Sequence, residues 1–309
     1  MPASPPDRPS RPPLPLVLGD SAVLTGMGLM LLAGFFSSLL HLGVRFAAPE
    51  LSAIQIVFVR SLFTLAATAP FLLLGKALSW QTKAPGLHVL RGVVGVFSMW
   101  AWYWALAHLP LADAGVLSFT TAIFVVVGAA LWFGEPVGLR RWMAVVVGLA
   151  GAVVVLKPGA GIVTWAALAA IGSSMLWAVS LLMAKDLSRY DSTLTITFYQ
   201  PLMIAPFAGL AAIPVWVWPS PGVWLVLAGM GLVAGLGNYC YVQSLRIADA
   251  SVVMPVDYVR LLWMVAWGYW LFAEVPGWTT WIGAALIIGA TGFIAWRESW
   301  LKRQQRRQV

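Results

Sequence analysis

Asp257 and Arg260 are oppositely charged residues three positions apart, in a stretch that is otherwise apolar enough and long enough to cross a bilayer, residues 250–273. Positions i and i+3 of a helix share one face, so the carboxylate and the guanidinium can pair. A charge at the bilayer centre costs about 2.5–3.5 kcal/mol on insertion scales, which makes such residues candidates for function. The pair indicates either a substrate site within a membrane or a structural ion pair between helices.

Arg60 is a third charge within a predicted membrane segment, residues 52–74. At the 1.5 Å rise of a helix, Arg60 and Arg260 each lie about 14–15 Å from an end of their segments, near the midplane. Guanidinium groups bind anionic groups in fixed geometry, so the functional interpretation is a site for an anionic or zwitterionic substrate. Asp257 balances these charges in that interpretation, and it is the coupling candidate if protons accompany the substrate.

Other aromatic and polar side chains inside predicted segments are further candidates for substrate binding. Aromatic rings can stack on a planar aromatic substrate, while amides and hydroxyls can form hydrogen bonds with it. Packing, or a hydrogen bond to a neighbouring helix, is the alternative role for each. These candidates are Tyr258, Trp177, Trp263, Trp267, Tyr199, Gln200, Asn238 and Thr121.

Pro255 removes a backbone hydrogen bond beside the charged pair, so it is predicted to kink its helix and to act as a hinge. The three histidines fall on separate segments, with His41 expected at the outer interface, and Cys240 is the only cysteine. We therefore predict no metal site, no cofactor and no disulfide. The sequence also lacks a phosphate-binding glycine loop and a nucleophile motif, which disfavours an enzyme.

The composition is that of a polytopic membrane protein. Of the 309 residues, 61% are hydrophobic and only 10% are charged, whereas soluble domains carry about 25% charged residues. Ten stretches are long and apolar enough to cross a bilayer. We therefore predict an all-α fold. The segments are residues 22–44, 52–74, 87–107, 112–133, 141–156, 164–184, 193–217, 222–245, 250–273 and 278–296.

The basic residues test this count of ten. With both termini in the cytoplasm, all but four of the 19 Lys and Arg residues lie on the cytoplasmic side; Arg45 and Lys157 lie outside, and Arg60 and Arg260 lie within the membrane. This distribution follows the positive-inside rule and accounts for the net charge of +8 without nucleic acid. Residues 1–20 are predicted to be a disordered, proline-rich cytoplasmic leader, and residues 298–309 a basic cytoplasmic tail that contacts lipid.

An internal repeat divides the chain into residues 21–157 and 158–297. The run Tyr103 to Asp113 aligns with Tyr239 to Asp249, and Phe133-Gly134-Glu135 aligns with Phe272-Ala273-Glu274. Each unit holds five predicted helices, and an odd number forces the second unit to enter the membrane from the opposite side. The prediction is an inverted-topology repeat, the architecture in which secondary transporters place a substrate site near the midplane and alternate access to it.

Three motifs carry a resemblance to a known family: Phe58-Val59-Arg60, the run LPLADAGVLSFTTAIF from Leu109, and ADASVVMPVDYVRLLW from Ala248 with FAEVPGWTTWIGAALI from Phe272. With the repeat, they resemble the EamA family of the drug/metabolite transporter superfamily, over residues 22–297. The detailed sequence of these motifs is similar to that of the bacterial branch that includes riboflavin and S-adenosylmethionine carriers.

The resemblance implies a secondary transporter of a small organic metabolite in a bacterial inner membrane, working by alternating access. The substrate is expected to be anionic, zwitterionic or planar aromatic. A translocase for lipids or lipid-linked molecules and a non-transport partner subunit remain alternatives. The small multidrug carriers of the superfamily rely on an acidic residue in their first helix, and this chain has no carboxylate between Asp20 and Glu50. Their proton-for-drug exchange is therefore not expected here.

Overall fold

A computed structural model describes residues 20–74, 82, 84–133, 139–156, 165–187, 189–247 and 253–307. Regular structure in these ranges is helical throughout, as the composition predicts. The elements are α1 (Asp20–Ala47), α2 (Ala53–Leu74), α3 (Pro85–His108), α4 (Leu111–Ser118), α5 (Thr120–Phe133), α6 (Leu139–Leu156), α7 (Trp165–Leu187), α8 (Thr193–Ala212), η1 (Ile213–Val215), α9 (Pro221–Ile247), η2 (Met254–Val259), α11 (Arg260–Phe272) and α12 (Trp278–Arg307).

Six stretches of the described helices are long and apolar enough to span a membrane: Ala22–Ala47, Pro85–His108, Leu111–Trp132, Trp165–Leu187, Thr195–Val215 and Pro221–Tyr241. Shorter apolar helices cover Ala53–Thr68, Trp142–Leu156 and Trp278–Ala290. The remaining predicted segment corresponds to η2 and α11 together. The structure therefore shows a helical protein with several candidate membrane spans, while the count of ten crossings stays a prediction.

The polarity of the molecule is the reverse of that of a soluble protein. Large apolar side chains such as Leu131, Leu225 and Trp270 are exposed, whereas Arg60, His88 and other polar side chains are buried. Lipid as the surrounding solvent explains both observations, since it favours apolar side chains outside and hydrogen-bonded polar groups inside.

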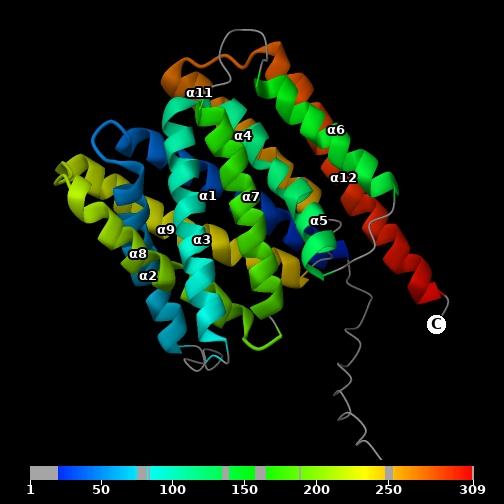
Figure 1. The fold of residues 1–309 in the computed structure, drawn as a ribbon, viewed down its shortest axis with the longest axis horizontal. Coiled ribbons are helices and arrows are strands. Elements are labelled where there is room, and N and C mark those ends of the chain that lie inside the picture. The colour runs from blue at the N-terminus through cyan, green and yellow to red at the C-terminus, as the bar shows by residue number, and fades with distance from the viewer. Residues whose placement is uncertain are drawn as a thin grey trace, which may run out of the picture.

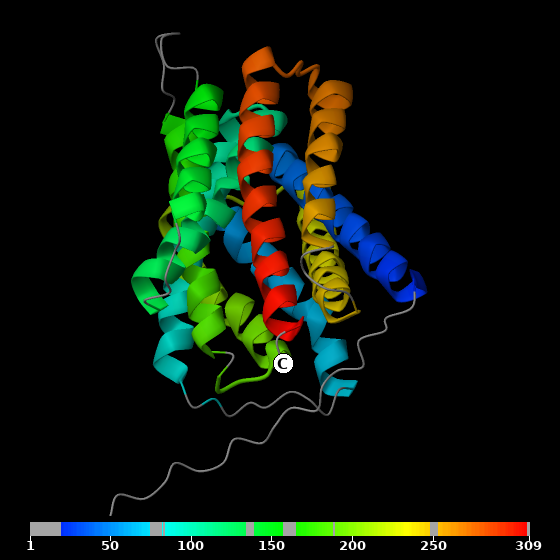
Figure 2. The same ribbon diagram turned by 90° about the vertical axis from the view of Figure 1, so that its right-hand side faces the viewer.

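The helices pack as a bundle in which partners come from distant parts of the chain (Figure 1). The most extensive packing joins α1 to α9, α3 to α7 and α6 to α12, and α2 packs against α8. The start of α1 and the end of α12 lie toward the same end of the bundle (Figure 2). The apolar core runs through these interfaces, and it includes Ile56, Leu106, Leu117 and Ile204.

Two of the predicted segments are interrupted rather than continuous. The segment at 112–133 divides at Phe119 into α4 and α5, and the ninth segment consists of the 3₁₀ helix η2 followed by α11. Pro255 lies in the first turn of η2, where its missing N–H costs no hydrogen bond. The predicted distortion next to Asp257 is therefore present, although its role as a hinge stays a prediction.

The sequence predicts a leader at the N-terminus and a basic tail at the C-terminus. Of the predicted leader, residues 1–20, all but Asp20 lie outside the described residues. At the other end α12 continues as helix to Arg307, beyond the predicted boundary at 297, so most of the basic tail extends α12.

Candidate substrate-binding site

Arg260, the first residue of α11, makes several long contacts with polar groups. Its Nη2 atom lies 3.5 Å from Oδ2 of Asp257, as the i, i+3 spacing predicts. The guanidinium also donates to the hydroxyls of Ser37 at 3.4 Å and Ser118 at 3.5 Å, and it lies 5.1 Å from the centre of the Phe119 ring. Because these distances are at the upper limit for hydrogen bonds, the guanidinium is able to donate to a closer partner.

The two interrupted segments meet at this arginine. Phe119, between α4 and α5, packs edge-on against Tyr258 of η2 with ring centres 5.0 Å apart. The break exposes the carbonyl of Leu117, which accepts hydrogen bonds from Thr120 Oγ1 at 2.6 Å and Ser174 Oγ at 3.4 Å. Irregular backbone at membrane depth is stable where such partners satisfy it.

Arg60 lies on α2 and is 7% exposed. Its Nη2 atom contacts the sulfur of Met99 at 3.3 Å, and its guanidinium lies 6.0 Å from the Tyr103 ring centre. Its Nε atom is buried and has no hydrogen-bond partner among the described residues. A methionine sulfur is a weak acceptor and no carboxylate pairs with Arg60 in the described part of the chain. This buried cation is therefore poorly satisfied by the protein itself.

His41 is a further polar side chain of α1, one turn after Ser37 and Ser38. The sequence predicts an interfacial position for it, but its side chain is buried (6% exposed) and packs edge-on against Trp102 of α3 at 5.3 Å. Its Nδ1 atom is buried without a hydrogen-bond partner among the described residues. The signal that could have identified it is the spacing of Ser37, Ser38 and His41, which puts polar groups on one face of an apolar helix.

An aromatic group adjoins the charged residues along α11. Trp263 and Trp267 are stacked with ring centres 6.5 Å apart, and Phe35 of α1 meets Trp263 edge-on at 5.2 Å. Trp267 donates its indole N–H to Ser38 Oγ at 3.0 Å, whereas the indole nitrogen of Trp263 is buried with no hydrogen-bond partner in the part of the chain that the structure describes. We call Phe35, Trp263 and Trp267 the aromatic group of the central site.

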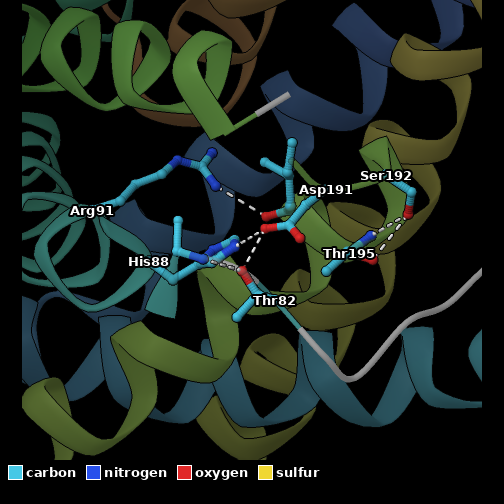
Figure 3. A network of polar contacts seen from close by, with 8 residues as sticks. Thr82, His88, Arg91, Asp191, Ser192 and Thr195 are labelled. Atoms are coloured by element: carbon cyan, nitrogen blue, oxygen red, sulfur yellow. Dashed lines mark hydrogen bonds and ion pairs between the residues drawn. The ribbon is translucent and has the colours of Figure 1, made fainter. Parts of the chain in front are cut away.

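A second polar network lies where α3 and α8 begin (Figure 3). Asp191 accepts from Thr82 Oγ1 at 2.6 Å and pairs with His88 Nε2 at 2.8 Å, and both side chains of that pair are buried. Arg91 donates to the side chain of Gln200 at 2.9 Å, and to the carbonyls of α7 and α8. Tyr199 packs against His88 with ring centres 4.5 Å apart.

The predicted site residues thus fall into three groups. Arg60, Asp257, Tyr258, Arg260, Trp263 and Trp267 lie in or beside the central cluster, together with the unpredicted Phe35, Ser37, Ser38, His41, Ser118 and Phe119. Tyr199 and Gln200 lie in the Asp191 network. Trp177 and Thr121 are partly buried in α7 and α5, and Asn238 is exposed on α9.

A third set of contacts closes the opposite end of the bundle. Arg45 of α1 pairs with Glu274 at 2.5 Å and donates to the carbonyls of Leu106 and Leu109. The second carboxylate oxygen of Glu274 accepts from the backbone N–H of Leu111 at 2.8 Å. These contacts join α1, the α3–α4 connection and the residues after α11.

Comparison with known proteins identifies the family of this helical chain. Residues 24–157 and 164–296 each match the EamA-like transporter family. The chain belongs to this family. A riboflavin transporter of Vibrio cholerae is 34% identical over 288 residues, covering 92% of this chain and 97% of that protein. An S-adenosylmethionine uptake transporter of Rickettsia felis is 29% identical, covering 89% and 94%.

Another relative is the pseudopaline exporter CntI of Pseudomonas aeruginosa, 30% identical over 86% of this chain and 94% of that protein. A solved crystal structure shares the fold with a TM-score of 0.60 at 20% identity, covering 90% of this chain and 98% of the other. As a member of the EamA-like transporter family, the chain is a membrane transporter of a small metabolite and not an enzyme.

Proposed function

We propose that this EamA-like transporter works by alternating access around a midplane site formed by Arg60, Asp257 and Arg260. The observation that carries the proposal is the meeting of two interrupted helices at Arg260, through Ser118, Phe119 and the paired Asp257. Secondary transporters commonly build their substrate sites from discontinuous helices at the interface of two repeats.

The helix packing supports an inverted-topology repeat. If the first unit is superposed on the second, α1 corresponds to α7, α2 to α8 and α3 to α9. Exchanging the units then converts the α1–α9 interface into the α7–α3 interface, and α2–α9 into α8–α3. All four interfaces occur in the bundle, and the family matches each half of the chain separately.

The crossing of α6 and α12 gives a residue-level form of the same argument. The offset of 139 residues that aligns Glu135 with Glu274 relates Ala144 to Gly283 and Gly151 to Ala290. A Cβ atom at Gly283 would lie 2.8 Å from the Gly151 carbonyl oxygen, and Ala144 packs with Ala290. Exchanging the repeats converts each of these contacts into the other, as expected for a pseudo-twofold axis through the crossing.

The proposed location is the bacterial inner membrane, with ten crossings and both termini in the cytoplasm. The bacterial origin of the relatives and the apolar outer surface of the bundle support a location in a bacterial membrane. The start of α1 and the end of α12 at one end of the bundle support an even number of crossings (Figure 2). The positive-inside rule then assigns that end to the cytoplasm.

A flavin such as riboflavin is the substrate that the site favours among those named for the relatives. Two guanidinium groups and one carboxylate leave the central site with an excess of positive charge. That excess disfavours S-adenosylmethionine, whose sulfonium is a cation. A neutral or anionic molecule with a flat ring fits the charge, and its ring can stack on the aromatic group.

Counterflow in proteoliposomes tests this function. Vesicles loaded with riboflavin are expected to accumulate labelled riboflavin, and Arg260→Ala is expected to lower the rate at least about tenfold because a charge-assisted contact is lost. Arg189→Ala is the matched control, since the side chain of that arginine is 63% exposed and pairs with Asp186. Normal counterflow by a folded Arg260→Ala protein would remove Arg260 from the site.

A further inference from the structure

Four buried polar atoms of the central site have no hydrogen-bond partner among the residues that the structure describes: Arg60 Nε, Arg260 Nε, Trp263 Nε1 and His41 Nδ1. Buried polar groups in native proteins are almost always hydrogen-bonded, and leaving one unpaired is costly. Four of them in one region, beside the buried side chain of Arg60 and the partly buried side chain of Arg260, therefore indicate the place of a bound molecule.

The chemistry of the four atoms describes the partner they require. The Nε atoms of both arginines and the indole nitrogen of Trp263 only donate hydrogen bonds. His41 is the one member of the set that can accept, because an imidazole nitrogen without a proton carries a lone pair. With the Nδ1 atom of His41 unprotonated, a ligand that satisfies all four atoms accepts three hydrogen bonds and donates one.

The arrangement of the helices adds a shape to this chemistry. Arg260 and Trp263 lie one turn apart on α11, and α11 faces Phe35, Ser37 and Ser38 of α1. His41 follows one turn later on α1 and packs against Trp102 of α3, the residue before Tyr103, over whose ring the Arg60 guanidinium lies. The hydrogen-bonding groups thus border the stacked indoles of Trp263 and Trp267, where a flat ring can lie.

We infer that the site binds the imide edge of a planar heteroaromatic ring system, and that His41 accepts the hydrogen bond of the imide N–H. This edge consists of an N–H between two carbonyl groups, next to ring nitrogens. The inference rests on the proposed transport function and adds the part of the substrate that is recognised. It makes His41 a specificity residue, which discriminates between rings with and without the donor.

Binding of two flavins to the purified, detergent-solubilised protein tests the inference. Riboflavin carries the imide N–H, and 3-methylriboflavin has a methyl group in its place. Wild-type protein is expected to bind riboflavin at least about tenfold more tightly, because methylation leaves His41 unpaired and adds a clash. Equal affinity for the two flavins, or no binding of riboflavin by the folded protein, would overturn the inference.

Variants of His41 assign the discrimination to that residue. His41→Phe is expected to bind the two flavins with similar affinity, whereas His41→Gln keeps an acceptor oxygen and retains a preference for riboflavin. His108→Phe is the matched control, since that histidine is exposed at the end of α3. A preference that persists in His41→Phe would remove His41 from the recognition.

The riboflavin counterflow described above separates this inference from the proposed function. Arg260-dependent counterflow together with equal affinity for the two flavins would agree with the proposed transport function and overturn only the proposed recognition of the imide edge.

Discussion

Asp257 is the side chain whose charge most directly controls Arg260. Its carboxylate lies 3.5 Å from the guanidinium, and its side chain is 21% exposed, so it is neither sealed in the core nor freely hydrated. Loss of this negative charge would release Arg260 to bind a substrate acceptor.

Asp257→Asn is therefore expected to lower the KM for riboflavin uptake, because Arg260 loses its charged partner and is free to bind the substrate. Initial uptake rates at a series of riboflavin concentrations in proteoliposomes measure the effect. Asp186→Asn, which alters a surface ion pair with Arg189, is expected to keep the wild-type KM. If both variants keep the wild-type KM, the charge of Asp257 does not control Arg260.

Sequence reasoning identified the charged centre because a charge in an apolar segment is visible without any structure. Arg60, Asp257 and Arg260 met that criterion, and the i, i+3 spacing correctly predicted the contact of Asp257 with Arg260. Gln200 is a candidate for substrate binding because it is polar and lies inside a predicted segment, and its side chain accepts a hydrogen bond from Arg91 of α3. The sequence indicates the helix and the depth of a residue, whereas the neighbouring helix decides its partner.

At the scale of elements, one of the two helix breaks has a clear sequence signal and the other has none. Pro255 marks the distortion in η2. The break at Phe119 has no proline, and it depends on Thr120 and Ser174 hydroxyls that satisfy the Leu117 carbonyl. Ser174 comes from α7, so this break is set by tertiary contact, which a reading of local sequence cannot detect.

The α6–α12 crossing depends on the absence of a side chain at Gly283. A Cβ atom there would lie 2.2 Å from a methyl group of Val155 and 2.8 Å from the Gly151 carbonyl. Gly283→Ala is expected to destabilise the protein by about 1–3 kcal/mol through overpacking.

The melting temperature in detergent measures this change. Gly289→Ala in the same helix is the control, since a Cβ atom at Gly289 meets nothing within 4 Å. That control is expected to be neutral or slightly stabilising, because alanine favours a helix over glycine. Equal melting temperatures for the two variants would show that the crossing can separate at little cost.

At the scale of the whole molecule, polar contacts join helices at both ends of the bundle, and we call each of these two sets of contacts a tie. Arg45 and Glu274 close the end that the proposed topology places outside, and both are mostly buried. His88, Asp191 and Thr82 close the end that the same topology places in the cytoplasm (Figure 3). Alternating access requires one end to open while the other stays closed, so each tie must break in half of the cycle. Removing a tie should therefore favour opening of its own end.

Opposite shifts are expected for the two ties. In a Cys240→Ser background, Ser37→Cys beside Arg260 reports access to the central site through labelling by an impermeant thiol reagent. Glu274→Ala is expected to speed labelling from outside, and Asp191→Ala from the cytoplasmic side, each about tenfold, since a charge-assisted contact is worth about 1.5–3 kcal/mol. Asp186→Ala, at the same end as Asp191 but in a surface pair, should leave both rates unchanged. Faster labelling from the same side in both tie variants would mean that the contacts only stabilise the fold and do not select between the two open states.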